Sequence, residues 1–146
     1  MKSPTIYLGA DHNGFRLKES LEKWLLARGY CVEDLSTKKA AGDDYPKIGF
    51  TVAKAVVKNP GSRGVLICGS GIGVAIAANR VKGIRAAAAH TPAEVKKARA
   101  DEDLNILTLS GWTMSEKKAV TLLRPFLTAP CSRAARHKRR VKQLDT

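Results

Sequence analysis

The chain has 146 residues, of which 44% are hydrophobic, and its formal net charge is +13. This length suits one compact domain with a single core, spanning residues 1–146, and no apolar run approaches the roughly 20 residues that span a bilayer. The first residues pass directly into strand-like sequence, without the apolar segment of a signal peptide. We therefore expect a single-domain cytoplasmic protein that has no membrane partner.

Short apolar runs alternate with amphipathic stretches along the chain, which is typical of βαβ units around a parallel sheet. We expect strands at residues 5–9, 30–35, 64–68, 83–89 and 104–110. We expect helices at residues 15–25, 45–58, 74–81, 92–99, 115–127 and 134–144. The fold class is therefore α/β: a doubly wound, Rossmann-like, five-stranded parallel sheet with helices on both faces and one further C-terminal helix.

The three cysteines are odd in number and show no CxxC spacing, so neither a disulfide framework nor a zinc site is indicated. Cys31 lies in an apolar strand-like run and is expected in the core. Cys68 differs because it ends a strand. In doubly wound sheets, ligands bind beyond the carboxyl ends of the strands. The candidates at those ends are Asp11, His12, residues 68–73, His90, Thr91 and residues 110–112.

The segment CGSGIG, residues 68–73, joins a strand to a helix, and its glycines let backbone N–H groups converge on an anion. It is not a dinucleotide fingerprint, because Val74 stands where the third glycine would be, and it lacks the lysine of a Walker loop. A thiol beside such a nest suggests a nucleophile, a general base or a merely structural cysteine. A base that removes a proton next to a carbonyl, with the nest holding the enediolate oxygen, uses every part of the loop.

Basic residues crowd the segment 132–142, which contains six lysines and arginines. They could form an ordinary solvated helix, a phosphate clamp or a surface for polyanions. Only 5% of the chain is aromatic, which argues against base stacking and makes nucleic acid an unlikely partner.

The pieces GADHNGFRLKESL, DDYP, GVLICGSGIGVAIAANRVKGIRAA and ARHKRRV, in this order and spacing, resemble the ribose-5-phosphate isomerase B family. That family includes the galactose-6-phosphate isomerase subunits. The resemblance implies an aldose–ketose isomerase that acts on a sugar phosphate through an enediol, with no metal or other cofactor. It also implies sites built between two subunits, in a homodimer or a homotetramer.

The resemblance also implies roles for individual residues. Cys68 matches the base that moves a proton between C1 and C2, and Ser70 belongs to the same catalytic loop. The substrate-binding residues would be Asp11, His12, Tyr45, Gly69, Gly71, Ile72, Gly73 and Asn79. The phosphate-binding residues would be His12, Arg136 and Arg140, and a spacing of four puts the two arginines on one face of the last helix. His137 matches a family histidine.

Two positions depart from the family pattern. Before the fifth strand, Asp101 and Glu102 replace a His-Asn pair whose histidine is implicated in opening the sugar ring, and after that strand Trp112 stands where an arginine is common. Asp101 or Glu102 could replace the lost acid if one of them stays protonated, and His90 is a further candidate. Ser70 in place of a more frequent threonine is a milder change.

The altered pair could instead mark a changed substrate. A four-carbon sugar with its phosphate on O4 cannot close the furanose ring and needs no opening step. We expect interconversion of ribose 5-phosphate and ribulose 5-phosphate. The alternatives are a tetrose 4-phosphate, a hexose 6-phosphate and a non-catalytic relative that binds polyanions.

Overall fold

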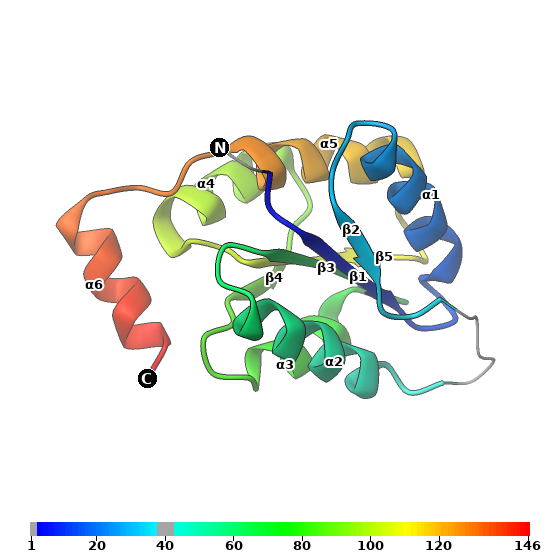
Figure 1. Cartoon of the computed structure of the whole chain (residues 1–146), viewed down its shortest axis with the longest axis horizontal. Coiled ribbons are helices and arrows are strands. Elements are labelled where there is room, and N and C mark those ends of the chain that lie inside the picture. The colour runs from blue at the N-terminus through cyan, green and yellow to red at the C-terminus, as the bar shows by residue number, and fades with distance from the viewer. Residues whose placement is uncertain (1–2, 38–42) are drawn as a thin grey trace.

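The computed structural model describes residues 3–37 and 43–146. In this part of the chain a sheet of parallel strands has the order β2-β1-β3-β5-β4 (Figure 1). The strands are β1 (Ile6–Ala10), β2 (Val32–Asp34), β3 (Arg63–Cys68), β4 (Ala86–Ala88) and β5 (Ile106–Ser110). The helices are α1 (Phe15–Leu26), α2 (Tyr45–Lys58), α3 (Ile72–Asn79), α4 (Pro92–Glu102), α5 (Glu116–Thr128) and α6 (Ala135–Leu144). The predicted doubly wound α/β class is confirmed.

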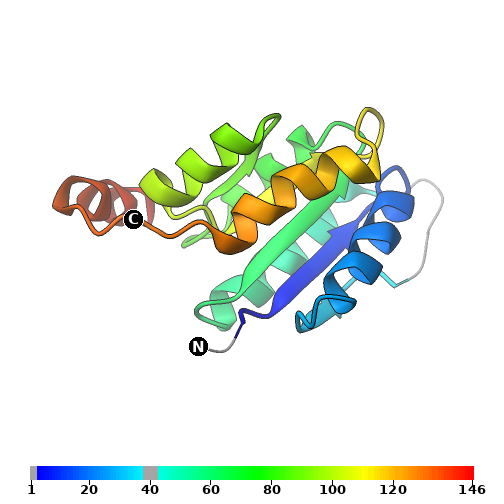
Figure 2. The same cartoon turned by 90° about the horizontal axis from the view of Figure 1, so that it is seen from above.

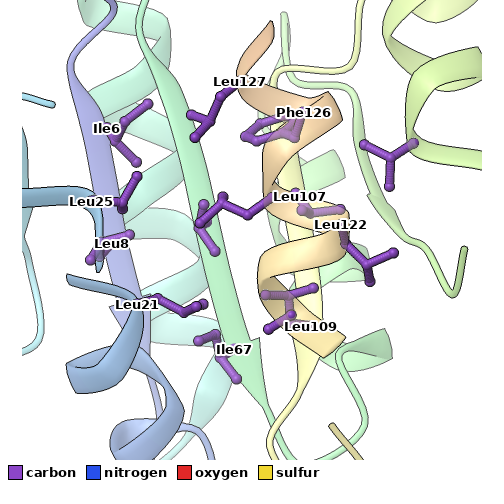
Figure 3. Packing of buried hydrophobic residues seen from close by; sticks show 14 of the residues in the cluster. Ile6, Leu8, Leu21, Leu25, Ile67, Leu107, Leu109, Leu122, Phe126 and Leu127 are labelled. Carbon is purple, nitrogen blue, oxygen red and sulfur yellow. The ribbon is translucent and has the colours of Figure 1, made fainter. Parts of the chain in front are cut away.

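Helices cover both faces of the sheet. Side chains of α1, α4 and α5 form one apolar layer with the strands, and those of α2 and α3 form the other (Figure 2). Strands buried on both faces have near-continuous apolar sequences, as in the runs that form β1, β3 and β5. In the larger layer, Leu21 and Leu25 of α1 and Leu122 and Phe126 of α5 meet across the middle of the sheet (Figure 3).

The strand order places the ligand-binding crevice. The chain leaves β1 towards β2 on one side and later returns to form β3 on the other side of β1. The ends of these neighbouring strands are in register, with Ala10 opposite Ile67. The loops that follow them therefore diverge from the same point at the carboxyl edge, where α/β sheets bind their ligands.

Helix α6 stands apart from the two layers and packs against α4 (Figures 1 and 2). None of its residues is buried in the single chain. Its sequence is amphipathic and strongly basic, so the exposed face is the one that carries Arg136 and Arg140. A helix held at such a distance from its own core is available to a second molecule.

One prediction about the core is wrong. Cys31 is exposed, because β2 begins only at Val32 and is a three-residue edge strand. The turn at Gly29 lets the N–H of Tyr30 donate to the carbonyl of Leu25. Tyr30 therefore belongs to the turn and not to the predicted strand.

Candidate active site

The carboxyl ends of β1 and β3 open into a cavity of about 490 Å³. The residues that line it come from the loops after β1 and β3, the start of α2, the first turns of α3 and the loop after β5. They are Asp11, His12, Asn13, Asp43, Asp44, Tyr45, Cys68, Gly69, Ser70, Ile72, Gly73, Ile76 and Trp112. The structure therefore brings six of the eight predicted substrate-binding residues together with Cys68 and Ser70, whereas Gly71 and Asn79 do not line the cavity.

Cys68 lies in this cavity with its side chain only 3% exposed. Its Sγ accepts a hydrogen bond from the N–H of Gly71 at 3.2 Å, so the loop folds back over the sulfur. Gly71 has a φ of 79°, and a Cβ there would lie 2.9 Å from the backbone of Leu109. Only glycine meets both demands, and the loop geometry depends on it.

Two side chains of β5 hold the rest of the loop through hydrogen bonds. Ser110 Oγ donates to the carbonyl of Gly69 at 2.6 Å, and Thr108 Oγ1 donates to the carbonyl of Gly71 at 2.6 Å. Ser70 Oγ accepts from the N–H of Ile72 at 3.1 Å, which leaves its hydroxyl hydrogen for a ligand. The N–H groups of Gly71 and Ile72 are thus already bonded to Cys68 Sγ and Ser70 Oγ, and the cavity lies at the N-terminus of α3, a position that favours an anion.

The opposite wall is acidic and polar. Asp11 is 4% exposed, and its Oδ1 accepts from the N–H groups of Asn13 and Gly14 at 3.0 and 3.1 Å. His12 Nδ1 lies 2.8 Å from Asp43 Oδ1, and its backbone N–H donates to the same oxygen. A carboxylate that accepts from Nδ1 holds the imidazole with Nε2 free for a ligand.

Tyr45 and Trp112 frame the mouth of the cavity. The Tyr45 ring lies where a Cβ on Gly73 would be, at 2.6 Å, and the Trp112 indole covers Gly69 so closely that a Cβ there would overlap it. Trp112 is 69% exposed. The two glycines thus let aromatic side chains rest directly on the loop backbone.

Four predicted site residues lie at the opposite end of the sheet. Asp101 and Glu102 end α4, just before β5 begins, and Arg136 and Arg140 lie on α6. The length of a five-residue strand, roughly 16 Å, separates this amino edge from the Cys68 loop. The single chain therefore does not bring these residues to the cavity.

Asn79 does not line the cavity either. Its amide donates to the carbonyl of Ala86 and accepts from the N–H of Ala86, both at 2.8 Å, and so fixes the start of β4. Its predicted contact with substrate stays a prediction, since the amide is bonded to Ala86 in the single chain. His90 is exposed beyond β4 at the far side of the sheet and is not a cavity residue.

Asp101 is a poor proton donor where it stands. Its Oδ2 lies 2.9 Å from Lys97 Nζ and its Oδ1 lies 3.6 Å from His137 Nε2. The hydrogen bond to Lys97 chiefly, with the charges of Lys97, His137 and Arg136, lowers the pKa of Asp101 below its usual value. In the single chain these contacts favour the charged form of Asp101, so its role as a proton donor stays a prediction.

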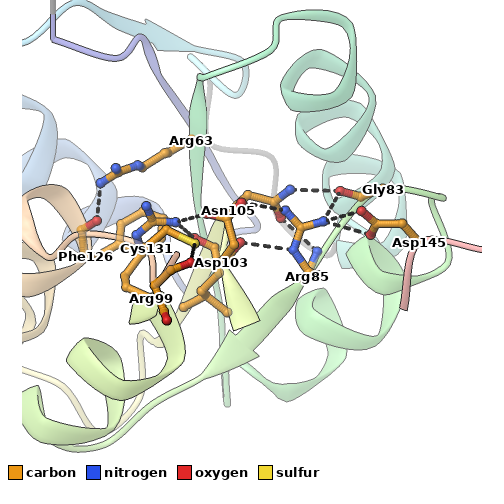
Figure 4. Close-up of polar contacts among 11 residues, drawn as sticks. Arg63, Gly83, Arg85, Arg99, Asp103, Asn105, Phe126, Cys131 and Asp145 are labelled. Carbon is orange, nitrogen blue, oxygen red and sulfur yellow. Dashed lines mark hydrogen bonds and ion pairs between the residues drawn. The ribbon is translucent and has the colours of Figure 1, made fainter. Parts of the chain in front are cut away.

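A polar network anchors α6 to this edge (Figure 4). Arg85 Nη1 binds both carboxylate oxygens of Asp145 at 2.7 and 2.8 Å, and Arg85 Nη2 reaches Asp103, which also pairs with Arg99 at 2.7 Å. At the other end of the helix, His137 approaches Asp101. Contacts near both ends of α6 thus connect the helix to the rest of the chain.

Sequence reasoning missed Asn13, Asp43, Asp44 and Ile76 as residues that line the cavity. Asp43 belongs to the DDYP segment from which only Tyr45 was selected, although an acidic pair just before a helix is a signal for binding a histidine or a hydroxyl group. Ile76 follows one helical turn after Ile72 and shares its face, so the helical period could have shown it.

Fold and site together define a doubly wound α/β protein that holds a thiol over a backbone anion nest at the switch point of its sheet. Residues 6–144 match the ribose/galactose isomerase family. The chain belongs to this family, as its motifs predicted.

Named relatives agree with this membership. The chain is 35% identical over 142 residues to ribose-5-phosphate isomerase B of Mycobacterium tuberculosis, covering 97% of this chain and 88% of that protein. A structure of a ribose 5-phosphate isomerase from Thermotoga maritima superposes with a TM-score of 0.92 at 37% identity and covers 97% of both chains. Ribose-5-phosphate isomerase B from Mycoplasma genitalium with bound ribulose 5-phosphate gives a TM-score of 0.92 at 35% identity, covering 99% of this chain and 95% of that one.

Proposed function

We propose that this protein is an aldose–ketose isomerase that interconverts ribose 5-phosphate and ribulose 5-phosphate, with Cys68 as the base. The observation that carries the proposal is the Cys68 sulfur in the cavity, bonded to the N–H of Gly71 in the glycine-rich loop that leads into α3. The relatives that share the fold and about a third of the sequence are named for this reaction.

The reaction needs one base and one oxyanion site. Cys68 Sγ, as thiolate, takes the proton from C2 of the open-chain aldose, and the electron pair moves into a C1–C2 double bond while the C1 oxygen becomes an enediolate. The loop N–H groups and the Ser70 hydroxyl stabilise that oxygen, which is where negative charge develops. Return of the proton from sulfur to C1, with the hydroxyl proton of O2 passing to O1, completes the ketose.

The phosphate needs cations that the cavity does not supply from its own described residues, among which no lysine or arginine lines it. Arg136 and Arg140 offer the charge, but they lie at the other edge of the same chain. A second copy would bring its α6 to the cavity, so we propose a site shared between subunits of at least a homodimer.

Two surfaces support this assembly. Ile72 and Ile76 of α3 are 58% and 62% exposed in the single chain, which is a high exposure for neighbouring apolar side chains beside a polar cavity. A cavity of about 580 Å³ between α6 and the rest of the chain, lined by His137, Val141 and others, leaves space for an element of the partner.

Within residues 3–37 and 43–146, no helix is long and apolar enough to cross a membrane. Cys31 and Cys131 are free thiols on the surface, and they support the proposal of a reducing, cytoplasmic setting.

A second candidate is the isomerisation of a tetrose 4-phosphate, and the state of Asp101 favours it. A furanose needs an acid or base to open, whereas Asp101 is ion-paired with Lys97. If no other group opens the ring, a substrate that cannot form the ring fits the site better. Glu102, exposed beside Asp101, is the remaining carboxylate for ring opening in the ribose case.

The test is an isomerase assay with four-, five- and six-carbon sugar phosphates on the wild-type protein and on Cys68→Ser. We expect turnover of ribose 5-phosphate that falls by about 10² to 10⁴ in the variant, while binding of ribulose 5-phosphate persists. Faster turnover of the tetrose phosphate would establish the second candidate. No turnover of any sugar phosphate would overturn both, and near-normal turnover by Cys68→Ser would exclude Cys68 as the base.

A further inference from the structure

Trp112 is the most exposed of the large apolar side chains at the mouth of the cavity, at 69%. Its backbone is nevertheless tightly held: Trp112 N–H donates to the carbonyl of Gly69 at 3.1 Å, and the preceding Gly111 N–H donates to that of Cys68 at 2.8 Å. The indole is therefore carried on the loop after β5, which is hydrogen-bonded to the Cys68 loop. An exposed indole on a rigid backbone beside a reactive group is unusual for a residue that only packs.

The lining of the cavity is mixed in chemistry. Trp112 is apolar and lies against Gly69, whereas Asp11 and His12 are polar. An open-chain sugar has C–H groups along its carbon chain as well as hydroxyl groups. The cavity can therefore offer polar side chains to the hydroxyls and the indole to the C–H groups.

We propose that Trp112 is a substrate-binding residue whose indole packs against the carbon chain of the sugar phosphate. The inference rests on the proposed function and adds to it a contact that carries no charge. The contact gains from dispersion and from removing the indole face from water. It acts on the carbon chain in the ground state and in the enediolate alike, so it should lower KM and leave kcat nearly unchanged.

Kinetics of Trp112→Ala and Trp112→Phe on ribose 5-phosphate test the role. We expect KM to rise about tenfold in Trp112→Ala with kcat within about threefold, and Trp112→Phe to stay near wild type because the phenyl ring keeps an aromatic face. The matched control is Trp24→Phe, at the chain's other tryptophan. Trp24 lies on α1, far from the cavity, and its ring stacks against Arg28. That control should change neither constant.

Fluorescence gives a second, direct readout. In the Cys68→Ser background, ribulose 5-phosphate should alter the intrinsic tryptophan emission, and the change should persist in Trp24→Phe and vanish in Trp112→Phe. A ligand-induced change that survives in Trp112→Phe would overturn the proposal.

The outcomes separate this inference from the function on which it rests. A wild-type enzyme that is active, with an unchanged KM in Trp112→Ala, overturns the role of Trp112 alone. A variant with unchanged KM but an altered oligomeric state makes the indole a subunit contact and also overturns it. A wild-type protein that isomerises no sugar phosphate overturns the proposed function and this contact together.

Discussion

Lys18 is wholly buried, and its ammonium group connects α1 to the segment beside the cavity. Nζ lies 2.5 Å from Asp34 Oδ2 and 2.7 Å from the carbonyl of Ser36, and it sits 4.3 Å above the centre of the Phe15 ring. Ser36 Oγ in turn accepts from the N–H of Ala10, which directly precedes the site residue Asp11. A buried cation with satisfied hydrogen bonds thus fixes the end of β1.

Lys18→Met should therefore destabilise the protein strongly. The change keeps the volume but leaves Asp34, 7% exposed, as a buried and unpaired carboxylate, and we expect a loss of about 3 to 5 kcal/mol in the free energy of unfolding. Urea denaturation measures it, with Lys23→Met on the exposed side of α1 as the control. Equal stability of the two variants would show that the Lys18 ion pair contributes nothing.

At the scale of residues, sequence reasoning predicted the centre of the site better than its surroundings. The cysteine, the glycines and Asp11 could be placed together because each follows a strand end of one sheet. Lys18 could not be found, because a lysine in an amphipathic helix is usually on the surface. The bond of the Asn79 amide to Ala86 could not be predicted either, because it depends on how α3 packs against β4.

At the scale of elements, helix limits were predicted well where the chain carries a strong local signal. The range of α2 was predicted correctly, since Pro46 lies in its first turn and NPG follows it. Helix α4 starts where expected, after Thr91, but continues to Glu102 and ends at Asp103, whose φ of 49° is an unusual conformation for a residue other than glycine. No sequence signal marks such an end.

The hydrogen bonds at the start of α4 predict how the stability of the fold depends on pH. Glu94 accepts from the N–H groups of His90 and Thr91 at 2.8 and 3.1 Å, and these bonds lower the pKa of Glu94 below its ordinary value of 4.5. A carboxylate with a lowered folded-state pKa stabilises the fold above the unfolded-state pKa, and this contribution is lost as the pH falls through the folded-state value.

Glu94→Gln should thus be less stable than wild type at neutral pH, and the gap should shrink below about pH 4.5. Thermal unfolding between pH 3 and pH 7 measures the gap, and Glu33→Gln on the exposed side of β2 is the control. A gap that is constant with pH would contradict the role assigned to the charged carboxylate.

At the scale of the whole molecule, the two groups of residues to which the proposed function assigns roles lie at opposite edges of one sheet. The Cys68 loop follows the carboxyl ends of the strands, and Arg136 and Arg140 lie on a helix anchored at the amino edge by Arg85 and Asp145. The strands fix this separation, so folding of a single chain cannot remove it. Patterns within one sequence predicted the sheet and both groups of residues, but only the family resemblance suggested that two copies complete a site.

Hybrid dimers test this central claim most directly. Two differently tagged chains, one with Cys68→Ser and the other with Arg136→Ala and Arg140→Ala, are co-expressed, and the hybrids are isolated through both tags. If the sites are shared, one of the two sites of the hybrid takes Cys68 from the chain without the arginines and both arginines from the chain without Cys68. That site is intact, so about half of the wild-type activity should return. The control places all three changes in one chain and pairs it with the wild-type chain, which spoils both shared sites. An inactive first hybrid together with a half-active control would show that each chain builds its own site and would contradict the account.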